Sequence, residues 1–303
     1  MLTGKHLVFV GGDARQLEVI AQVVDNDASA TLVGFSDIHR DYTDTVYGDL
    51  TEEVLAKADA LVLPIAGMEN DGRVDTKFAA EPIMLTESHF AAMRPGAFVF
   101  TGIARSVLTE WCNSHSLQLV KLMELDEVAI LNSIPTAEGA IAIAMEETDI
   151  TLHGANTVVL GFGRCGQTLA HKLRAMGANV RVCARYASDL ARVDELSLVP
   201  VPLKQIEEAV RDADIVFNTI PALVLNAGVL REMARDCVII DIASKPGGTD
   251  FRYAERRGMR ALLAPSLPGL VAPKTAGRII ARSLSRILAE ESDGGHKEED
   301  IWS

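Results

Sequence analysis

The sequence predicts an α/β protein made of two domains in tandem, each built on a parallel sheet. The chain has 303 residues, which exceeds the size at which a single hydrophobic core usually stops growing. Short apolar runs rich in β-branched residues alternate along the whole chain with segments of helical period, as in parallel strands joined by helices. The first apolar run of each half ends in a glycine-containing turn.

Ten apolar runs mark the expected strands, five in each half of the chain. In the first half they are 5–10, 30–35, 60–65, 96–100 and 117–120. In the second half they are 156–163, 178–185, 212–220, 236–243 and 259–264. Because helical segments separate these runs, each half is predicted to be a doubly wound, Rossmann-like domain.

Long helices are expected to join the two domains. A segment with strong helix propensity begins near Pro135, and proline is favourable in the first turn of a helix. A second long helix over 273–291 has apolar residues at helical spacing and is expected to pack back on the first domain. These features predict an N-terminal substrate and catalytic domain over 1–132, a dinucleotide-binding domain over 133–272 and a flexible acidic tail over 292–303.

The composition argues against several classes of function. The formal net charge is -13 at pH 7, and nucleic acid is an unfavourable partner for such a chain because its phosphates require clustered Lys and Arg. The N-terminal apolar run before Gly11 is too short for a signal peptide or a membrane span. A cytoplasmic protein with no membrane contact is therefore expected. The 4 cysteines form no Cys-x-x-Cys pair, which predicts small buried thiols and no metal site.

A Gly-x-Gly-x-x-Gly segment opens the second domain. Its residues are Gly161, Phe162, Gly163, Arg164, Cys165 and Gly166. The segment follows an apolar strand and precedes a helix and another strand, which is the context that a dinucleotide fingerprint requires. Gly161 is expected to permit the tight turn, Gly163 to let the pyrophosphate approach the backbone, and Gly166 to let helix and strand pack closely. The alternative is a glycine-rich turn of purely structural use.

The end of the next strand predicts which form of the cofactor binds. An NAD enzyme usually has Asp or Glu there, whereas this chain has Arg185, whose guanidinium suits a 2′-phosphate. The site therefore favours NADP(H), and the alternative is a solvated arginine in a domain that accepts both cofactors. Two further loops at strand ends are expected to contact the cofactor. They contain Asn218, Thr219, Ile220 and Pro221, and Ala243 and Ser244.

Longer phrases are more specific than the fingerprint. They are VGGDARQLEV (10–19), MELDEVAILNSIPTAEGAI (123–141), TVVLGFGRCGQTLA (157–170), IDIASKPGGTDF (240–251) and LPGLVAPKTAG (267–277). The GFGRCG segment alone resembles 2-hydroxy-acid dehydrogenases, and together the phrases resemble the A-subunit family of dipicolinate synthase. This resemblance implies a sporulation enzyme of the mother-cell cytoplasm that works with a flavoprotein-like B subunit. The reaction it implies is oxidation of dihydrodipicolinate to dipicolinate, on a branch of the lysine and diaminopimelate pathway.

A substrate with two carboxylates, as the resemblance implies, requires fixed cations or free N–H groups. Lys245 is the candidate cation and, with Glu138, a candidate general base, while Asp13 is the third candidate catalytic residue. The candidate substrate-binding residues are Gly11, Gly12, Thr101, Gly102, Asn132, Ser133 and Thr136. For Asp13 and Ser133 the alternative is a helix cap. The loops that carry Arg15 and Arg105 are candidate carboxylate sites, and the alternative for both arginines is a solvated helix position.

Two other functions remain open at this point. The second domain by itself is compatible with a reductase of another small keto, imino or hydroxy acid. It is also compatible with a non-catalytic dinucleotide-binding subunit that positions a partner. None of the 7 histidines has a recognisable catalytic spacing, and His153 and His171 are interpreted as structural. The chain is also expected to form a homo-oligomer.

Overall fold

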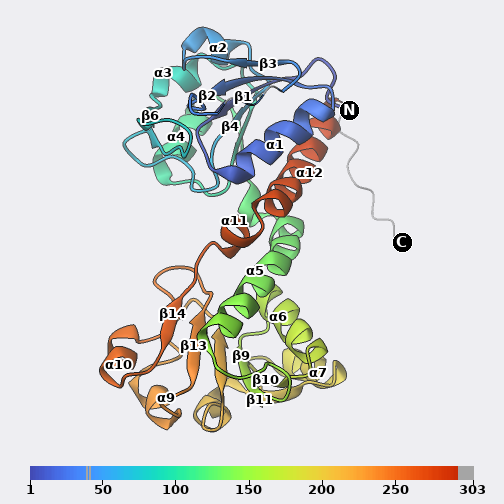
Figure 1. The fold of residues 1–303 in the computed structure, drawn as a ribbon. Helices are drawn as coiled ribbons and strands as arrows, with labels where there is room; N and C mark the ends of the chain where they lie inside the picture. The colour runs from blue at the N-terminus through green and yellow to red at the C-terminus, as the bar shows by residue number, and fades with distance from the viewer. Residues whose placement is uncertain (39, 41, 293–303) are drawn as a thin grey trace. The chain divides into compact units, whose positions relative to one another are not determined.

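The computed structural model describes residues 1–38, 40 and 42–292 of the chain. It contains two compact units, Met1–Ala129 with Pro273–Ser303, and Ile130–Ala272 (Figure 1). Apart from residue 292, the predicted acidic tail over 292–303 lies outside the described residues. Each unit has a parallel sheet with helices around it, which confirms the predicted α/β fold class.

The first unit is built on a six-stranded sheet in which every strand pair is parallel. Its strands are β1 (His6–Val10), β2 (Ser29–Val33), β3 (Thr45–Tyr47), β4 (Ala60–Val62), β7 (Phe98–Thr101) and β8 (Gln118–Lys121). Their order is β3-β2-β1-β4-β7-β8, the arrangement of a Rossmann fold. A short antiparallel pair, β5 (Arg73–Val74) and β6 (Ile83–Met84), lies outside this sheet.

Helices cover both faces of the first sheet. They are α1 (Ala14–Asp25), α2 (Glu52–Ala56), α3 (Glu87–Ala91), α4 (Ser106–Ser114) and α12 (Pro273–Ser292), with a 3₁₀ turn η1 (Leu122–Glu124). Successive side chains of β1 point to opposite faces of the sheet. Leu7 and Phe9 pack in the hydrophobic core on one face, and Val8 and Val10 pack in the core on the other. The helix α12 lies along α1 (Figure 1) and adds Leu284 to the first of these cores.

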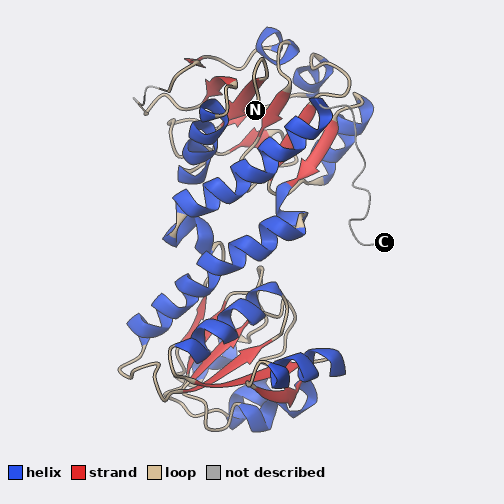
Figure 2. Cartoon of the chain, turned by 90° about the vertical axis from the view of Figure 1, so that its right-hand side faces the viewer, coloured by secondary structure: helices blue, strands red, loops and turns tan. Residues whose placement is uncertain are grey.

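The second unit repeats the same plan. Its strands are β9 (Asn156–Leu160), β10 (Asn179–Ala184), β11 (Val199–Pro202), β12 (Ile215–Asn218), β13 (Val238–Asp241) and β14 (Ala261–Leu263). Its helices are α5 (Asp126–Glu147, which begins in the first unit), α6 (Arg164–Ala175), α7 (Ala187–Glu195), α8 (Ile206–Ala209), α9 (Ala227–Glu232), α10 (Phe251–Arg256) and α11 (Leu267–Val271), with η2 (Leu203–Gln205). The strand order is β11-β10-β9-β12-β13-β14. Figure 2 shows this sheet between its helices.

The helix α5 differs from the sequence-based expectation. It begins at Asp126, and Pro135 lies inside it and not in its first turn. The acidic first turn, Asp126 and Glu127, favours the helix dipole and explains the earlier start. An interior proline lacks an N–H donor, and side chains beside it bond helix carbonyls. Ser133 donates to the Ile130 carbonyl at 2.6 Å, so the alternative prediction of a helix cap at Ser133 is wrong.

Both sheets also have an edge strand that the sequence did not reveal. These are β3, whose Val46 is 65% exposed, and β11, which contains Pro200 and Pro202. Proline cannot donate a ladder hydrogen bond and is therefore tolerated at sheet edges. Short exposed edge strands lack the continuous apolar run that marks a buried parallel strand.

The helix α5 is also long and apolar enough, by length and composition alone, to cross a membrane. Half of its most apolar window is buried within the structure. Ala137, Ala140, Ile141 and Ala144 of this helix belong to a hydrophobic core of the second unit. The apolar character of α5 is thus used in packing against the sheet.

Candidate functional site

The topology of each sheet defines where a ligand is expected to bind. The strand order reverses between β1 and β4 in the first unit, and between β9 and β12 in the second. Ligands of open α/β sheets bind outside the carboxyl ends of the strands at such a reversal point. There is accordingly one candidate site at the carboxyl edge of each sheet.

The turn after β9 meets the steric conditions of a phosphate-binding loop. Gly161 has a φ of +96°, and a Cβ there would lie 2.4 Å from the Thr219 hydroxyl oxygen. A Cβ on Gly166 would lie 2.2 Å from the carbonyl oxygen of Gly161. At Gly163, by contrast, no described atom beyond the adjacent backbone lies within 4 Å of the Cβ position. A tight turn, close helix packing and one open backbone position are what a dinucleotide fingerprint requires.

The start of α6 leaves backbone donors available to an anion. Its N-cap is Gly163, which has no side chain to cap the helix, and the first-turn N–H groups and the positive end of the dipole therefore face outward. Phe162 is buried in the core, and Arg164 is exposed. Burial raises the pKa of the Cys165 thiol, against the effects of Arg164 and of a hydrogen bond with Thr136. Cys165 is therefore a neutral thiol that contacts α5.

An open hollow lies beside the ends of β10 and β11. Its volume is about 580 Å³, and it is lined by Arg185, Ala187, Leu190, Pro202, Leu203 and Lys204. Arg185 and Lys204 are both exposed and come from the turns that follow the two strands. The hollow thus combines apolar walls with two cations, a combination that suits an adenosine carrying an additional phosphate. Lys204 was not anticipated from sequence because β11 was not recognised.

The loop after β12 is held by its own polar side chains. Asn218 is completely buried, donates through Nδ2 to the Ile220 carbonyl at 3.0 Å and accepts from the Ile220 N–H at 3.1 Å. The Thr219 hydroxyl donates to the Leu160 carbonyl at 2.8 Å. Pro221 is exposed. Asn218 and Thr219 therefore shape this loop next to the glycine turn, and a ligand would meet the loop backbone beyond them.

A buried carboxylate that the sequence analysis missed organises the loop after β13. Asp241 is completely buried; its Oδ1 accepts from the Ala243 N–H at 3.1 Å. Its Oδ2 accepts from the Gly248 N–H at 2.8 Å and from the Thr249 hydroxyl at 2.7 Å. A hydrophobic strand that ends in Asp is the sequence signal that could have identified this residue, since a buried charge requires such partners.

The loop that Asp241 holds presents the predicted cation to solvent. Ser244 and Lys245 are exposed, and Ala243 is buried. The peptide bond between Lys245 and Pro246 is cis. The Lys245 ammonium makes no hydrogen bond or ion pair with a described residue. It is thus a cation available to a ligand at the carboxyl edge of the second sheet.

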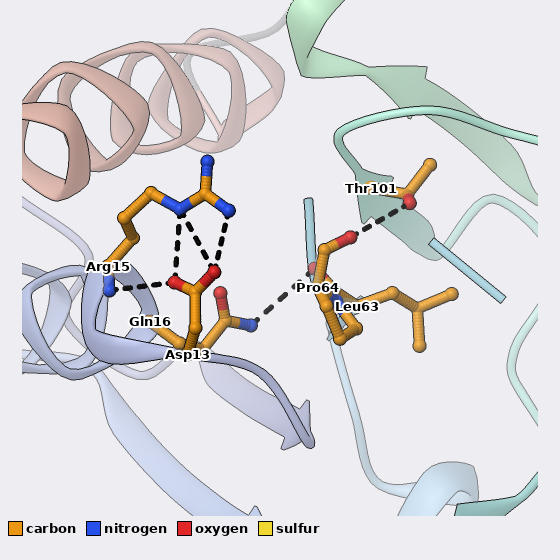
Figure 3. A network of polar contacts seen from close by, with 6 residues as sticks. All are labelled: Asp13, Arg15, Gln16, Leu63, Pro64 and Thr101. Carbon is orange, nitrogen blue, oxygen red and sulfur yellow. Dashed lines mark hydrogen bonds and ion pairs between the residues drawn. The ribbon is translucent and has the colours of Figure 1, made fainter. Parts of the chain in front are cut away.

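In the turn after β1 of the first unit, the Asp13 carboxylate lies at the start of α1 (Figure 3). Gly11 and Gly12 have φ values of +64° and +124°, which favour glycine. Asp13 caps α1 by accepting from the Arg15 N–H at 3.0 Å, and its carboxylate pairs with the Arg15 guanidinium at 2.6 Å. Burial raises the pKa of Asp13, but the hydrogen bonds and charge of Arg15 and the charge of Lys77 outweigh it, and the net pKa is lowered.

This geometry bears on two predicted roles. It confirms the alternative prediction that Asp13 is a helix cap, and a carboxylate of lowered pKa paired with an arginine is poorly suited to accept a proton at neutral pH. A substrate carboxylate at the start of α1 would compete with that of Asp13. The predicted alternative of a solvated Arg15 is wrong, since this side chain is 13% exposed and paired.

The predicted residues after β7 hold neighbouring loops together. The Thr101 hydroxyl donates to the Ile103 carbonyl at 2.9 Å and lies 3.3 Å from the Pro64 carbonyl; Figure 3 shows the contact with Pro64. A Cβ on Gly102 would lie 2.3 Å from the Ile65 carbonyl oxygen. Arg105 donates to the carbonyls of Ala66 and Met68 in the loop after β4, and it pairs with Glu69 of the same loop at 2.7 Å. Arg105 is therefore a loop-holding residue, and the predicted alternative of a solvated position is wrong.

Polar residues of α5 make contacts within the second unit. Ser133 and Thr168 share a hydrogen bond between their hydroxyls at 2.6 Å, and the Thr136 hydroxyl donates to the Asn132 carbonyl at 2.7 Å. The Glu138 carboxylate is 56% exposed and pairs with Lys172 at 3.0 Å. Asn132 is 5% exposed, and its side-chain oxygen has no hydrogen-bond partner among the described residues. Within this set, the Asn132 side-chain oxygen is therefore a buried acceptor available to a further donor.

The other cysteines and histidines of the described part of the chain have structural surroundings. Burial raises the pKa of the Cys112, Cys183 and Cys237 thiols to about 12; these cysteines are neutral core residues, as predicted. Within residues 1–38, 40 and 42–292, no three His, Cys, Asp or Glu side chains lie close enough together to hold a metal ion. A Cβ on Gly177 would lie 2.2 Å from His153, so this histidine packs against the turn before β10.

Comparisons with known proteins agree with the geometry of the second unit. Residues 137–245 match the family model described as D-isomer specific 2-hydroxyacid dehydrogenase, NAD binding domain. The fold is also shared with the apo-structure of D-lactate dehydrogenase from Escherichia coli, at a TM-score of 0.61 and 12% identity over 96% of this chain and 98% of that chain. Fold and glycine turn together define a dehydrogenase-type oxidoreductase with a nicotinamide dinucleotide site.

The family is shown by closer relatives. Residues 6–123 match the family model of the N-terminal domain of the dipicolinate synthase A subunit. The chain is 45% identical over 271 residues to the dipicolinate synthase A subunit of Bacillus subtilis (strain 168), covering 89% of this chain and 91% of the relative. The crystal structure of the Bacillus halodurans A subunit has a TM-score of 0.92 and 49% identity, covering 96% of this chain and 99% of that chain. The chain belongs to the A-subunit family of dipicolinate synthase.

Proposed function

We propose that this chain is the NADP(H)-dependent subunit that oxidises dihydrodipicolinate to dipicolinate during spore formation, together with a flavoprotein-like B subunit. The observation that carries the proposal is the 45% identity, over 89% of the chain, to the Bacillus subtilis A subunit. The geometry of the second unit supports the dinucleotide dependence. A general reductase of keto acids has no such specific observation in its favour.

The residues present fit a dinucleotide. The open position at Gly163 and the uncapped start of α6 would receive the pyrophosphate. Arg185 and Lys204 would hold the 2′-phosphate in the hollow beside β10 and β11, which supports NADP(H) over NAD(H). When bound, NADP⁺ supplies the acceptor for the two electrons and one hydrogen that leave the ring as it becomes aromatic.

The chain itself must bind the carboxylates and take up the remaining proton. Lys245 is exposed without a counter-ion in the described part of the chain, so it can bind a carboxylate without breaking an existing ion pair. Glu138 would first have to leave Lys172, but as a carboxylate it can accept a proton. We therefore propose Lys245 as the substrate-binding cation and Glu138 as the candidate proton acceptor; Lys245 in its deprotonated form is the alternative acceptor.

We further propose that the protein acts in the mother-cell cytoplasm as a homo-oligomer. Its acidic net charge of -13 is unfavourable for binding nucleic acid. A small dicarboxylate is the expected substrate, and the B subunit is the expected protein partner.

Reduction of the cofactor is the direct test. Freshly generated hydroxytetrahydrodipicolinate, which gives dihydrodipicolinate on loss of one water, is added to the purified chain with NADP⁺, with and without the B subunit, and the absorbance of NADPH is followed. We expect NADPH to form together with dipicolinate. Binding of NADPH without turnover in either condition would instead support a non-catalytic dinucleotide-binding subunit. Efficient reduction of simple 2-oxo acids with NADPH as the hydride donor would support a general reductase.

A further inference from the structure

A second hollow lies at the carboxyl edge of the first sheet, where β1 and β4 end. Its volume is about 440 Å³. It is lined by Gly12, Asp13, Pro64, Ala66, Arg73, Asp75, Thr76, Lys77, Ala79, Ala80 and Pro82. All these residues belong to the first unit. The hollow lies at the strand-order reversal point, where ligands of open α/β sheets bind.

One wall of this hollow is residues 73–82, here called the edge strap. Backbone hydrogen bonds join it to the turn after β1, from the Gly12 N–H to the Asp75 carbonyl at 3.2 Å and from the Lys77 N–H to the Gly12 carbonyl at 2.8 Å. The Thr76 hydroxyl donates to the Gly34 carbonyl at 2.8 Å. The backbone of the edge strap is therefore fixed across the ends of β1 and β2.

Aromatic packing anchors the other side of the edge strap. The rings of Phe78 and Phe35 stack with their centroids 5.5 Å apart, and the Phe78 carbonyl accepts from the Asp37 N–H at 2.9 Å. A fixed backbone places the Lys77 side chain at the hollow before any ligand arrives, which lowers the entropy cost of binding.

The charges that line the hollow are balanced except for one. Asp13 is neutralised by Arg15 at 2.6 Å, and Asp75 by Arg73 at 3.2 Å. The Lys77 ammonium helps to lower the pKa of Asp13 through its charge, but it makes no hydrogen bond or ion pair with a described residue. In a chain with a net charge of -13, an unpaired cation in a hollow is a local reason for an anion to bind.

We propose that Lys77 binds a carboxylate of a small aromatic or dihydroaromatic dicarboxylate in this hollow, and that it is the substrate-binding cation of the first unit. The assignment of the substrate class rests on the proposed function. Pro64, Ala66, Ala79, Ala80 and Pro82 supply apolar wall for a flat ring. The start of α1 is already capped by Asp13, so the ligand carboxylate is directed to Lys77.

The test is binding of pyridine-2,6-dicarboxylate to the full chain, measured by calorimetry with and without NADP⁺. Lys77→Met keeps the side-chain length and removes the charge, and Lys77→Arg restores the charge. The matched control is Lys57→Met, an exposed lysine at the end of α2, before β4 begins and so at the opposite edge of the sheet. Pyridine-2-carboxylate serves as a second probe with a single carboxylate.

We expect Lys77→Met to weaken binding of the dicarboxylate at least tenfold, Lys77→Arg to retain it within about threefold, and Lys57→Met to leave it unchanged. NADPH affinity should be unchanged in all three. Equal affinity of Lys77→Met and the unmodified chain for the dicarboxylate, or no binding by the unmodified chain, overturns the inference. Binding that depends on Lys77 but without any turnover would sustain this site and overturn the proposed reaction instead.

Discussion

The two glycine turns that follow the first strand of each sheet have the same topology. They differ in whether a side chain of the protein caps the helix that follows. Each follows the first strand of a Rossmann-like sheet and precedes a helix of 12 residues. In the first turn, Asp13 caps the helix, and a Cβ on Gly12 would lie 3.0 Å from the Gln16 side chain. In the second turn, Gly163 leaves the helix uncapped and its own Cβ position open. The Asp13 side chain occupies the first helix start, whereas no side chain caps the second.

The comparison shows why a glycine-rich turn is weak evidence without its surroundings. Backbone freedom at Gly12 is used to fold the loop against α1 and the edge strap. Gly163 has an ordinary φ of -76°, so its lack of a side chain serves an approach from outside. The following predictions test this difference, beginning with the largest expected effect.

Gly163→Val should remove dinucleotide binding without unfolding the protein. We expect NADPH affinity to fall at least a hundredfold, about 2.7 kcal/mol, because the new side chain occupies the position open to the pyrophosphate. The melting temperature should change little, since no described atom beyond the adjacent backbone lies within 4 Å of the Cβ position. Calorimetry and thermal unfolding measure the two effects.

The matched control for this variant is Gly12→Val in the other turn. A valine at a φ of +124° is strained by about 1–3 kcal/mol, so the melting temperature should fall while the folded protein still binds NADPH. If both variants lose only stability, the contrast between the two turns does not concern ligand binding.

Lys245→Met tests the cation on the loop after β13, which makes no hydrogen bond or ion pair with a described residue, whereas Arg105 after β7 is paired with Glu69. We expect kcat/KM for dicarboxylate oxidation to fall at least a hundredfold, about 2.7 kcal/mol, with NADPH affinity within about twofold of the unmodified chain. The reason is loss of a fixed charge that replaces water around a buried carboxylate. Steady-state kinetics and calorimetry on the same preparation separate the two quantities. Parallel losses in both would assign Lys245 to the cofactor.

Asp241→Asn tests the loop that carries this lysine. The Asp241 carboxylate accepts hydrogen bonds from three donors. In the variant, the NH₂ group of the asparagine would face at least one of these donors, and that hydrogen bond would be lost. We expect a loss of about 2–3 kcal/mol in the free energy of unfolding, measured with urea. Thr101→Val removes the hydroxyl at the end of the corresponding strand, β7, and should cost only about 1 kcal/mol. Similar losses in the two variants would mean that the Asp241 carboxylate contributes no more to the free energy of unfolding than the single Thr101 hydroxyl.

Arg185→Ala should reduce the preference for NADPH over NADH. We expect a loss of about 1–3 kcal/mol in the difference between the two binding free energies, the scale of a charge-assisted hydrogen bond. NADH affinity itself should be unchanged, which serves as the internal control. Lys204→Met should act in the same direction, because both side chains line one hollow. Equal affinities for the two cofactors in the unmodified chain would contradict the prediction.

Asp13→Ala should have the smallest effect. Loss of the N-cap is expected to cost about 1 kcal/mol, with NADPH affinity unchanged. Because the folded-state pKa of Asp13 is lowered from 3.8, its contribution is present above that value and is lost as the pH falls through the folded-state pKa. The difference in unfolding free energy between variant and parent should thus be constant from about pH 7 to pH 5 and shrink in stronger acid. A difference that persists there would exclude the ionised carboxylate as its origin.

The sequence by itself determined the two α/β sheets and the glycine turn of the second unit. Buried parallel strands require continuous apolar runs, and these are visible without tertiary information, as in 156–160 and 238–241. The fingerprint could be identified because its three glycines are spaced along a single turn. The strands at the edges, β3 and β11, are short or contain proline, so they lack that signal.

Only the tertiary structure decided which polar residues are free to act. Asp13 and Arg105 looked available in the sequence but are bound to neighbouring groups. Asp241 looked like part of a strand but holds a loop through three hydrogen bonds. Lys77 and Lys204 line hollows formed by segments distant in the chain. Arg105 pairs with Glu69, which is far from it in the sequence. The partners of Asp13 and Asp241 lie within eight residues of them, but the conformation of the turn or loop decides whether these bonds form.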